Sequence, residues 1–276
     1  MALLTPDDLA DMTNALIKND CLIQELTTYS LDGLCRKVYG TAPGNEMIAI
    51  VPVTAGNGII GSFSESLLFT VKHFGMNGFI TENTDVAGYY EAVTAGADIV
   101  LMADDLAYIA HNLRNGKIAH NQVCTGRIYA EILCHAADFA DGDIDNDNID
   151  NDENALLVIG LGKVGTPALE TFLNEKQNIY VFDVDSKRVD EIVLHYPVKK
   201  YDPKDGKTFS RIFEATPCAD TISESVLREN SVVSTPGIPC GISGELIEKY
   251  SVRVVLEPLG IGTLSMLYAV FDFRVA

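Results

Sequence analysis

The stretch LLVIGLGKVG, residues 156–165, decides the fold of this chain. Four apolar residues that are typical of a buried strand lead into three glycines, and the following residues 164–173 have the apolar spacing of a helix. In this context Gly160 permits a tight turn, Gly162 lets the backbone approach a pyrophosphate, and Gly165 lets helix and strand pack closely. The N-terminus of the helix adds N–H donors and the positive end of its dipole. The stretch therefore predicts a dinucleotide-binding unit.

An acidic residue stands where this unit needs one. The next strand-like segment, NIYVFDVD (178–185), carries Asp183, which lies 23 residues after Gly160. A carboxylate there accepts hydrogen bonds from the adenosine ribose hydroxyls and repels a 2′-phosphate, although Lys187 and Arg188 follow closely and soften that repulsion. We therefore predict NAD as the cofactor, rather than NADP.

Two later loops support a dinucleotide over S-adenosylmethionine, which can use a similar glycine turn. EATPC (214–218) and STPGIP (234–239) both follow strand-like segments, so they lie at the carboxyl edge of the sheet, where the nicotinamide half would bind. The alternative to cofactor binding is that each of these residues only forms a rigid turn that ends a strand. The predicted cofactor-binding residues are Gly160, Leu161, Gly162, Lys163, Val164, Gly165, Asp183, Ala215, Thr216, Pro217, Cys218, Thr235, Pro236 and Gly237.

The same alternation of strand and helix occurs nearer the N-terminus. Strand-like residues 47–53 precede a glycine-rich loop and a helical pattern ending at Gly75, and two further strand patterns enclose a helix at 84–96. We expect an α/β protein with two doubly wound parallel-sheet domains, the C-terminal one a Rossmann domain. The predicted domains are residues 1–123, for the substrate, and 124–276, for NAD, with a helical pattern from Cys124 carrying the chain between the sheets.

A strongly polar segment, DGDIDNDNIDNDEN (141–154), is predicted to be a solvated linker. Asp141, Asp143, Asp145 and Asp152 have the spacing of a calcium loop, but Asn146 stands where that loop needs glycine. The six cysteines also lack the spacing of a metal site, which favours reduced thiols. We therefore predict no metal centre.

The composition excludes several classes of partner. The 276 residues are 47% hydrophobic and carry a net charge of −19, from 20 basic and 39 acidic residues, so no basic surface is available for nucleic acid or an anionic membrane. No secretion signal and no apolar run of 18 residues is present. We expect a cytoplasmic protein with a small-molecule partner, and the sequence leaves the oligomeric state open, a homo-oligomer included.

Six segments closely resemble the PylD family of pyrrolysine synthases, in order and over nearly the whole chain. The most specific are VTAGNGIIG (53–61), LMADD (101–105) and FEATPCA (213–219), and the others lie at 158–165, 234–240 and 257–263. The resemblance implies an NAD-dependent oxidation of L-lysine-Nε-(3R)-methyl-D-ornithine at the terminal carbon that bears the amine, followed by closure of the pyrroline ring. The acidic linker and the tail from Phe271 depart from the family pattern, and neither touches a motif.

Such a reaction needs a neutral amine, whereas an alkylamine has a pKa of about 10.4. Asp104, at the carboxyl end of a predicted strand, is where an open α/β sheet places ligand contacts, and we expect it to hold the amine and to relay a proton. Capping of a following helix by Asp104 or Asp105 is the alternative.

A carboxylate of the substrate needs donors, which the N-terminus of the helix at Phe63 and Ser64 can supply. Thr54 and Asn57 line the adjoining loop, for which simple turn chemistry is the alternative. Leu4 and Thr5 begin a predicted first helix that could close over the ligand as a lid. The predicted substrate-binding residues are Leu4, Thr5, Thr54, Asn57, Phe63, Ser64 and Asp104.

Two rival functions stay open. The first is another NAD-dependent dehydrogenase that acts on an amino acid, an imine or a folate. The second is a non-catalytic NAD(H)-binding redox sensor. A complete first sheet with a polar edge favours a second ligand, and so an enzyme.

Overall fold

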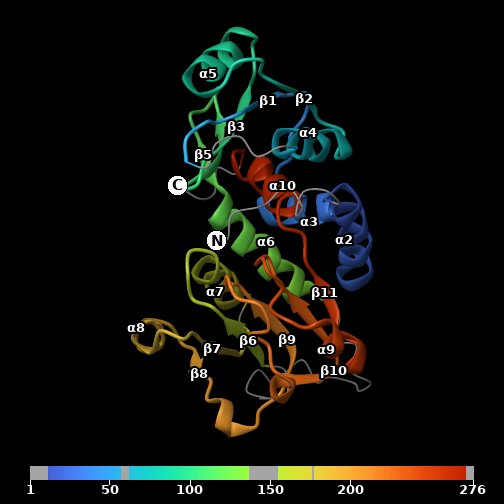
Figure 1. The fold of residues 1–276 in the computed structure, drawn as a ribbon, viewed down its shortest axis with the longest axis vertical. Coiled ribbons are helices and arrows are strands. Elements are labelled where there is room, and N and C mark those ends of the chain that lie inside the picture. The colour runs from blue at the N-terminus through green and yellow to red at the C-terminus, as the bar shows by residue number, and fades with distance from the viewer. Residues whose placement is uncertain (1–11, 57–61, 137–154, 176, 272–276) are drawn as a thin grey trace. The chain divides into compact units, whose positions relative to one another are not determined.

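The computed structural model describes residues 12–56, 62–136, 155–175 and 177–271 (Figure 1). These residues form two compact units, each built on one sheet. The first-sheet unit contains residues 12–24, 29–56, 62–128 and 257–271. The second-sheet unit contains residues 25–28, 129–136, 155–175 and 177–256. This division differs from the predicted 1–123 and 124–276, because the boundary falls after residue 128 and the C-terminal helix belongs to the first-sheet unit.

The first sheet has the order β2-β1-β3-β4-β5. The predicted β-α-β-α-β segment forms three parallel strands and two helices, which are β1 (Met47–Val51), α4 (Phe63–His73), β2 (Asn77–Ile80), α5 (Asp85–Thr94) and β3 (Ile99–Ala103). The antiparallel strands β4 (Tyr108–Asn112) and β5 (Ile118–His120) extend the sheet beyond β3. The sheet is therefore mixed, and this hairpin is an addition to the predicted parallel sheet.

Helices cover both faces of β1, because successive side chains of a strand point to opposite sides. Ala49 and Val51 pack in one apolar cluster with Ala92 of α5. Ile48 pairs in register with Gly78 of β2, where a Cβ would meet side chains of α4. Helix α5 therefore covers the face of Ala49, and α4 the face of Ile48, which makes this part of the unit three-layered.

The C-terminal helix α10 (Gly260–Ala269) is buried along its whole length within the first-sheet unit. It lies beside α3 (Leu31–Tyr39) and α4 (Figure 1). Tyr39 and Ser265 share a hydrogen bond of 2.6 Å, and the Tyr268 hydroxyl donates to Asp32 at the start of α3. A helix that is predominantly apolar around its circumference, with its few hydroxyl groups hydrogen-bonded, is buried as core, which explains its place between other elements. The helices α2 (Met12–Thr27) and α6 (Asn121–His135) each contribute residues to both units.

The second sheet has the order β11-β10-β9-β6-β7-β8, with every pair parallel. The chain enters at β6 in the middle and winds first to one side and then to the other, which is the strand order of a Rossmann sheet. This confirms the predicted fold class. The strands are β6 (Leu156–Ile159), β7 (Ile179–Phe182), β8 (Lys199–Lys200), β9 (Phe209–Glu214), β10 (Leu227–Ser234) and β11 (Arg253–Val255).

The helices of the second-sheet unit follow its strands. They are α7 (Gly165–Asn174), α8 (Ser186–His195) and α9 (Gly244–Lys249), with single turns of 3-10 helix, η2 (Pro203–Asp205) and η3 (Glu224–Val226). One face of the sheet packs in an apolar cluster that includes Leu157, Ile212 and Val233, all fully buried. Among the residues that the structure describes, no helix is both long enough and apolar enough to span a bilayer.

Candidate functional site

The glycine turn after β6 has the geometry that its sequence predicts. Gly160 has a φ of +90°, and a Cβ there would lie 2.8 Å from the carbonyl oxygen of Ala215. A Cβ on Gly165 would overlap the carbonyl oxygen of Gly160, so the start of α7 rests directly on the turn. Gly162, in contrast, has no heavy atom within 4 Å of the place of a Cβ. The turn is thus closed at both ends by packing and open at Gly162, as approach of a pyrophosphate requires.

Asp183 follows β7 and reaches back to the glycine turn. Its Oδ2 accepts a hydrogen bond of 2.8 Å from the Leu161 amide, and its Oδ1 accepts one of 2.9 Å from the Asp185 amide. The guanidinium of Arg188, in α8, lies 3.5 Å from Oδ2. The carboxylate is therefore fixed beside the turn and faces one basic side chain.

The loop after β9 lies against the same turn. The Ala215 amide donates to the carbonyl of Ile159, the last residue of β6, over 2.9 Å. A Cβ on Gly237, in the loop after β10, would lie 2.6 Å from the carbonyl oxygen of Thr216. The structure therefore brings together three of the predicted cofactor segments, 160–165, 215–218 and 235–237, at the carboxyl edge of the second sheet.

Glu214 is a residue of this edge that the site prediction missed. It ends β9 and is fully buried, yet the sequence-based list began one residue later, at Ala215. Its Oε1 accepts hydrogen bonds from the Thr216 amide and hydroxyl and from the Thr221 hydroxyl, and its Oε2 accepts one of 2.8 Å from the Thr235 hydroxyl. The available signal was an acidic residue that ends an apolar strand immediately before a proline loop.

The carboxyl edge of the first sheet is also polar. Both oxygens of Asp85, the first residue of α5, accept hydrogen bonds from Thr54, from its amide over 2.8 Å and its hydroxyl over 2.6 Å. These bonds lower the pKa of the Asp85 carboxyl below its usual range. Gly56, with a φ of +72°, lies directly against the Asp105 side chain. The loops after β1 and β3 and the start of α5 thus form one polar edge.

Asp104 is an exposed residue of the turn that joins β3 to β4. Its Oδ1 accepts hydrogen bonds of 2.8 Å and 2.7 Å from the amides of Leu106 and Ala107. Its Oδ2 accepts none from a described residue. The alternative in which Asp104 or Asp105 caps a following helix is wrong, because an antiparallel strand follows instead.

The predicted donors at the start of α4 are partly as expected. The first hydrogen bond within the helix runs from the Ser66 amide to the Ser62 carbonyl, so the amides of Phe63 and Ser64 have no partner within the helix. The Ser64 side chain is buried, and Phe63 packs edge-on against Tyr108. Ser62 precedes the helix with a φ of +69° and makes no capping bond through its side chain.

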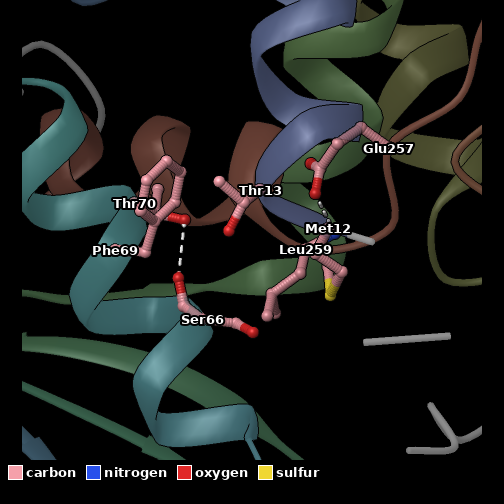
Figure 2. Close-up of a pocket in the computed structure, with 7 residues that line it drawn as sticks. All are labelled: Met12, Thr13, Ser66, Phe69, Thr70, Glu257 and Leu259. Carbon is pink, nitrogen blue, oxygen red and sulfur yellow. Dashed lines mark hydrogen bonds between the residues drawn. The ribbon is translucent and has the colours of Figure 1, made fainter. Parts of the chain in front are cut away.

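A small pocket lies beside α2, α4 and the segment that leads into α10 (Figure 2). At one side is Glu257, whose Oε2 accepts a hydrogen bond of 2.7 Å from the Ile261 amide and so caps α10. Burial raises the pKa of Glu257, although backbone donors oppose this. At the other side Thr70 donates to the Ser66 carbonyl over 3.0 Å. Glu257 and Thr70 therefore hydrogen-bond to the backbone of neighbouring helical residues, and none of the predicted site residues lines the pocket.

Several predictions fall outside the described residues. These are the contacts of Leu4, Thr5 and Asn57, the first helix as a lid, and the acidic linker 141–154 with its calcium alternative. Within the part of the chain that the structure does describe, no group of three histidine, cysteine or acidic side chains could hold a metal ion.

The residues at the second-sheet edge fit a dinucleotide. The open backbone at Gly162, the N-terminus of α7 behind it and the carboxylate of Asp183 at the next strand are the three parts that such a cofactor needs. Lys163 is exposed within the turn and so is accessible to a phosphate.

Solved structures share this architecture. Shikimate 5-dehydrogenase of Thermus thermophilus, solved in complex with NADP(H) and shikimate, superposes with a TM-score of 0.50 and 11% identity, over 81% of this chain and 92% of its own. The same enzyme in complex with shikimate alone superposes with a TM-score of 0.51 and 12% identity, over 81% of this chain and 91% of its own. This chain thus shares the fold of these structures.

Sequence comparison identifies the family. Residues 8–119 match the family "Pyrrolysine biosynthesis protein PylD, N-terminal domain". Pyrrolysine synthase of Methanosarcina barkeri (strain Fusaro) is 50% identical over 270 residues, 98% of each chain, and that of Methanosarcina acetivorans is 48% identical over 98% of this chain and 100% of its own. The chain therefore belongs to the PylD family.

Proposed function

We propose that this chain is a pyrrolysine synthase, an oxidoreductase of pyrrolysine biosynthesis. In this proposal it uses NAD to oxidise the terminal amine carbon of L-lysine-Nε-(3R)-methyl-D-ornithine, after which the pyrroline ring closes. The observation that carries the proposal is the 50% identity to a named pyrrolysine synthase over 98% of both chains. The glycine turn with its open position at Gly162 supports the use of a dinucleotide.

The second-sheet unit would hold the cofactor. When bound, NAD supplies the acceptor for a hydride. The amides at the start of α7 would face the phosphates, and the Asp183 carboxylate would accept hydrogen bonds from the ribose hydroxyls. The loops 215–218 and 235–237 would border the nicotinamide half of the cofactor. The Asp183 carboxylate would repel the 2′-phosphate of NADP, which favours NAD. The guanidinium of Arg188, 3.5 Å from Asp183, would attract that phosphate and so weaken the preference.

The first-sheet unit would hold the substrate. Asp104 has one oxygen fixed in its turn and the other without a partner among described residues, so it can receive the substrate amine and relay a proton. The amides of Phe63 and Ser64 would bind a carboxylate, and Thr54 lies beside the same edge. Loss of the hydride and a proton leaves an imine at the terminal carbon; the other free amine of the methylornithine part attacks this carbon, and the original terminal nitrogen leaves as ammonia, which gives the C=N bond of the pyrroline ring. This closure needs no further catalyst, because the attacking amine and the oxidised carbon belong to one molecule at high effective concentration.

The direct test is incubation of the protein with the lysine–methylornithine dipeptide and NAD, followed by mass analysis. We expect pyrrolysine and NADH to appear together. Formation of NADH with other amino acids or imines but not with this substrate would identify a different dehydrogenase, and NAD binding without turnover of any amine would identify a redox sensor.

The preference for NAD has its own test in Asp183→Asn. The amide removes the charge that repels a 2′-phosphate and leaves Arg188 available to bind one. We expect the ratio of kcat/KM for NAD to that for NADP to fall at least about 10-fold. An unchanged ratio would show that another residue sets the cofactor preference.

A further inference from the structure

Glu214 is a buried acidic side chain to which the proposed function assigns no role. Its exposed fraction is 0%, and it stands at the end of the central strand β9, in register with Ile159 immediately before the glycine turn. Burial of a carboxyl group is costly unless donors compensate it, and an apolar residue would suffice for packing at this position. The position therefore needs an explanation beyond the core.

The donors to Glu214 come from two different loops. Oε1 receives the amide of Thr216 over 2.9 Å and the hydroxyl of Thr221 over 3.0 Å, both from the loop after β9, called here the β9 loop (215–222). Oε2 receives the hydroxyl of Thr235 over 2.8 Å, from the β10 loop (235–241). One carboxyl group thus joins both loops, and among the described residues no basic side chain forms an ion pair with it.

Two glycines let the β10 loop approach this carboxyl group. A Cβ on Gly241 would lie 2.5 Å from the Glu214 carboxyl carbon, and one on Gly237 would lie 3.4 Å from Oε2. Any larger residue at Gly241 would push the loop away from Glu214. The shape of the two loops therefore depends on this carboxyl group and on the space around it.

We propose that Glu214 is a positioning residue for cofactor binding, because it ties the β9 loop to the β10 loop at the edge where the nicotinamide half would lie. The inference rests on the proposed function. Glu214 itself is buried beneath the loops and acts through Thr216 and Thr235. Without it the two loops lose their common anchor, and the cofactor loses a preformed surface.

The test compares Glu214→Ala with Glu214→Gln. Glutamine keeps a carbonyl oxygen for Thr216 and Thr221, and its NH2 group can donate to the Thr235 hydroxyl, so most of the tether remains. We expect Glu214→Ala to raise the Kd for NAD, measured by calorimetry, at least about 10-fold and to lower kcat, whereas Glu214→Gln stays within about 3-fold of the wild type.

Ser231→Ala is the matched control. Ser231 is also fully buried in β10, and it donates to the Phe209 carbonyl over 3.0 Å at the opposite end of β9. This variant also removes the hydrogen bond that the Ser231 hydroxyl accepts from the Arg228 amide over 3.0 Å, so it weakens the same sheet without touching the two loops. We expect a loss of thermal stability with the Kd for NAD unchanged. Equal loss of NAD affinity in Ser231→Ala and Glu214→Ala would reduce Glu214 to a structural role.

A further variant keeps the test decisive if Glu214→Ala does not fold. Thr235→Val has nearly the same shape and removes only the donor to Oε2. We expect a rise in the Kd for NAD of about 3-fold to 10-fold. Unchanged NAD binding in a folded Glu214→Ala or Thr235→Val variant would overturn the inference alone, whereas a wild-type protein that binds no dinucleotide would overturn the proposed function.

Discussion

Two glycines of one turn have different surroundings, so substitutions at them should affect stability and cofactor binding separately. Gly165 packs on the Gly160 carbonyl, whereas Gly162 faces open space. We expect Gly165→Ala to destabilise the protein by about 1–3 kcal/mol through overpacking. We expect Gly162→Ala to change stability by less than about 0.5 kcal/mol and to weaken NAD binding. Urea unfolding and NAD titration of both variants measure the two effects.

Each of the two glycine variants serves as the control for the other. Equal stability loss in both would mean that the turn is packed throughout, and unimpaired NAD binding by Gly162→Ala would place the pyrophosphate elsewhere.

Asp104 combines a role in a turn with a proposed role in catalysis, and one substitution can separate them. Asparagine keeps an oxygen for the amides of Leu106 and Ala107 but carries no charge. We expect Asp104→Asn to retain the stability and NAD affinity of the wild type and to lower kcat with the dipeptide substrate at least about 10-fold. A fully active variant would remove Asp104 from the mechanism.

The sequence identified those residues of the site that belong to one recurring strand–turn–helix–strand unit with a fixed spacing. The glycine turn and Asp183 are found by spacing, because each part of that unit constrains the next. Glu214 escaped because its proposed role depends on Thr235, which comes from the β10 loop, and the proximity of that loop to Glu214 depends on the order of the strands. The sequence also did not predict that Asp104 lies in a turn before a strand, because the segment after it was expected to be helical.

At the scale of elements, periodicity predicted the strands with a continuous apolar run and the helices α4, α5 and α7 between them, whereas α9, between β10 and β11, was not predicted. The hairpin of β4 and β5 was not predicted, although β4 alternates between buried and half-buried residues. Its alternation includes His111 and Asn112, which make the pattern weak by composition. The place of α10 in the first-sheet unit depends on distant partners such as Asp32, and no local pattern carries that information.

The start of α5 gives a pH-dependent prediction for one element. Asp85 has a φ of +53°, which asparagine also tolerates, so Asp85→Asn keeps the backbone and removes the charge. Hydrogen bonds from Thr54 lower the folded pKa of Asp85 below the unfolded value of about 3.9. A lowered folded pKa means that the ionised form stabilises the fold above the unfolded pKa, and that this contribution disappears as the pH falls through the folded pKa.

We therefore expect Asp85→Asn to be less stable than the wild type at pH 7, with the difference constant down to about pH 5 and shrinking below about pH 4. Urea unfolding of both proteins across this range measures the difference. Thr54→Val, which removes one of the donors, should show the same trend with smaller size. A difference that is independent of pH would assign the effect to the backbone rather than to the charge.

For the whole molecule, the dominant feature is a net charge of −19 on 276 residues. Like charges repel one another in the compact state, and salt weakens that repulsion by shortening the Debye length from about 10 Å at 0.1 M to about 3 Å at 1 M. We expect the Tm at pH 7.5 to rise by about 4 °C or more between 0.02 M and 1 M NaCl. At pH 4.5, near the isoelectric point of about 4.5, the net charge is close to zero and the same salt increase should leave the Tm nearly unchanged. An equal rise at both pH values would point to exclusion of the salt from the protein surface, and a fall at pH 7.5 would mean that specific ion pairs outweigh the repulsion.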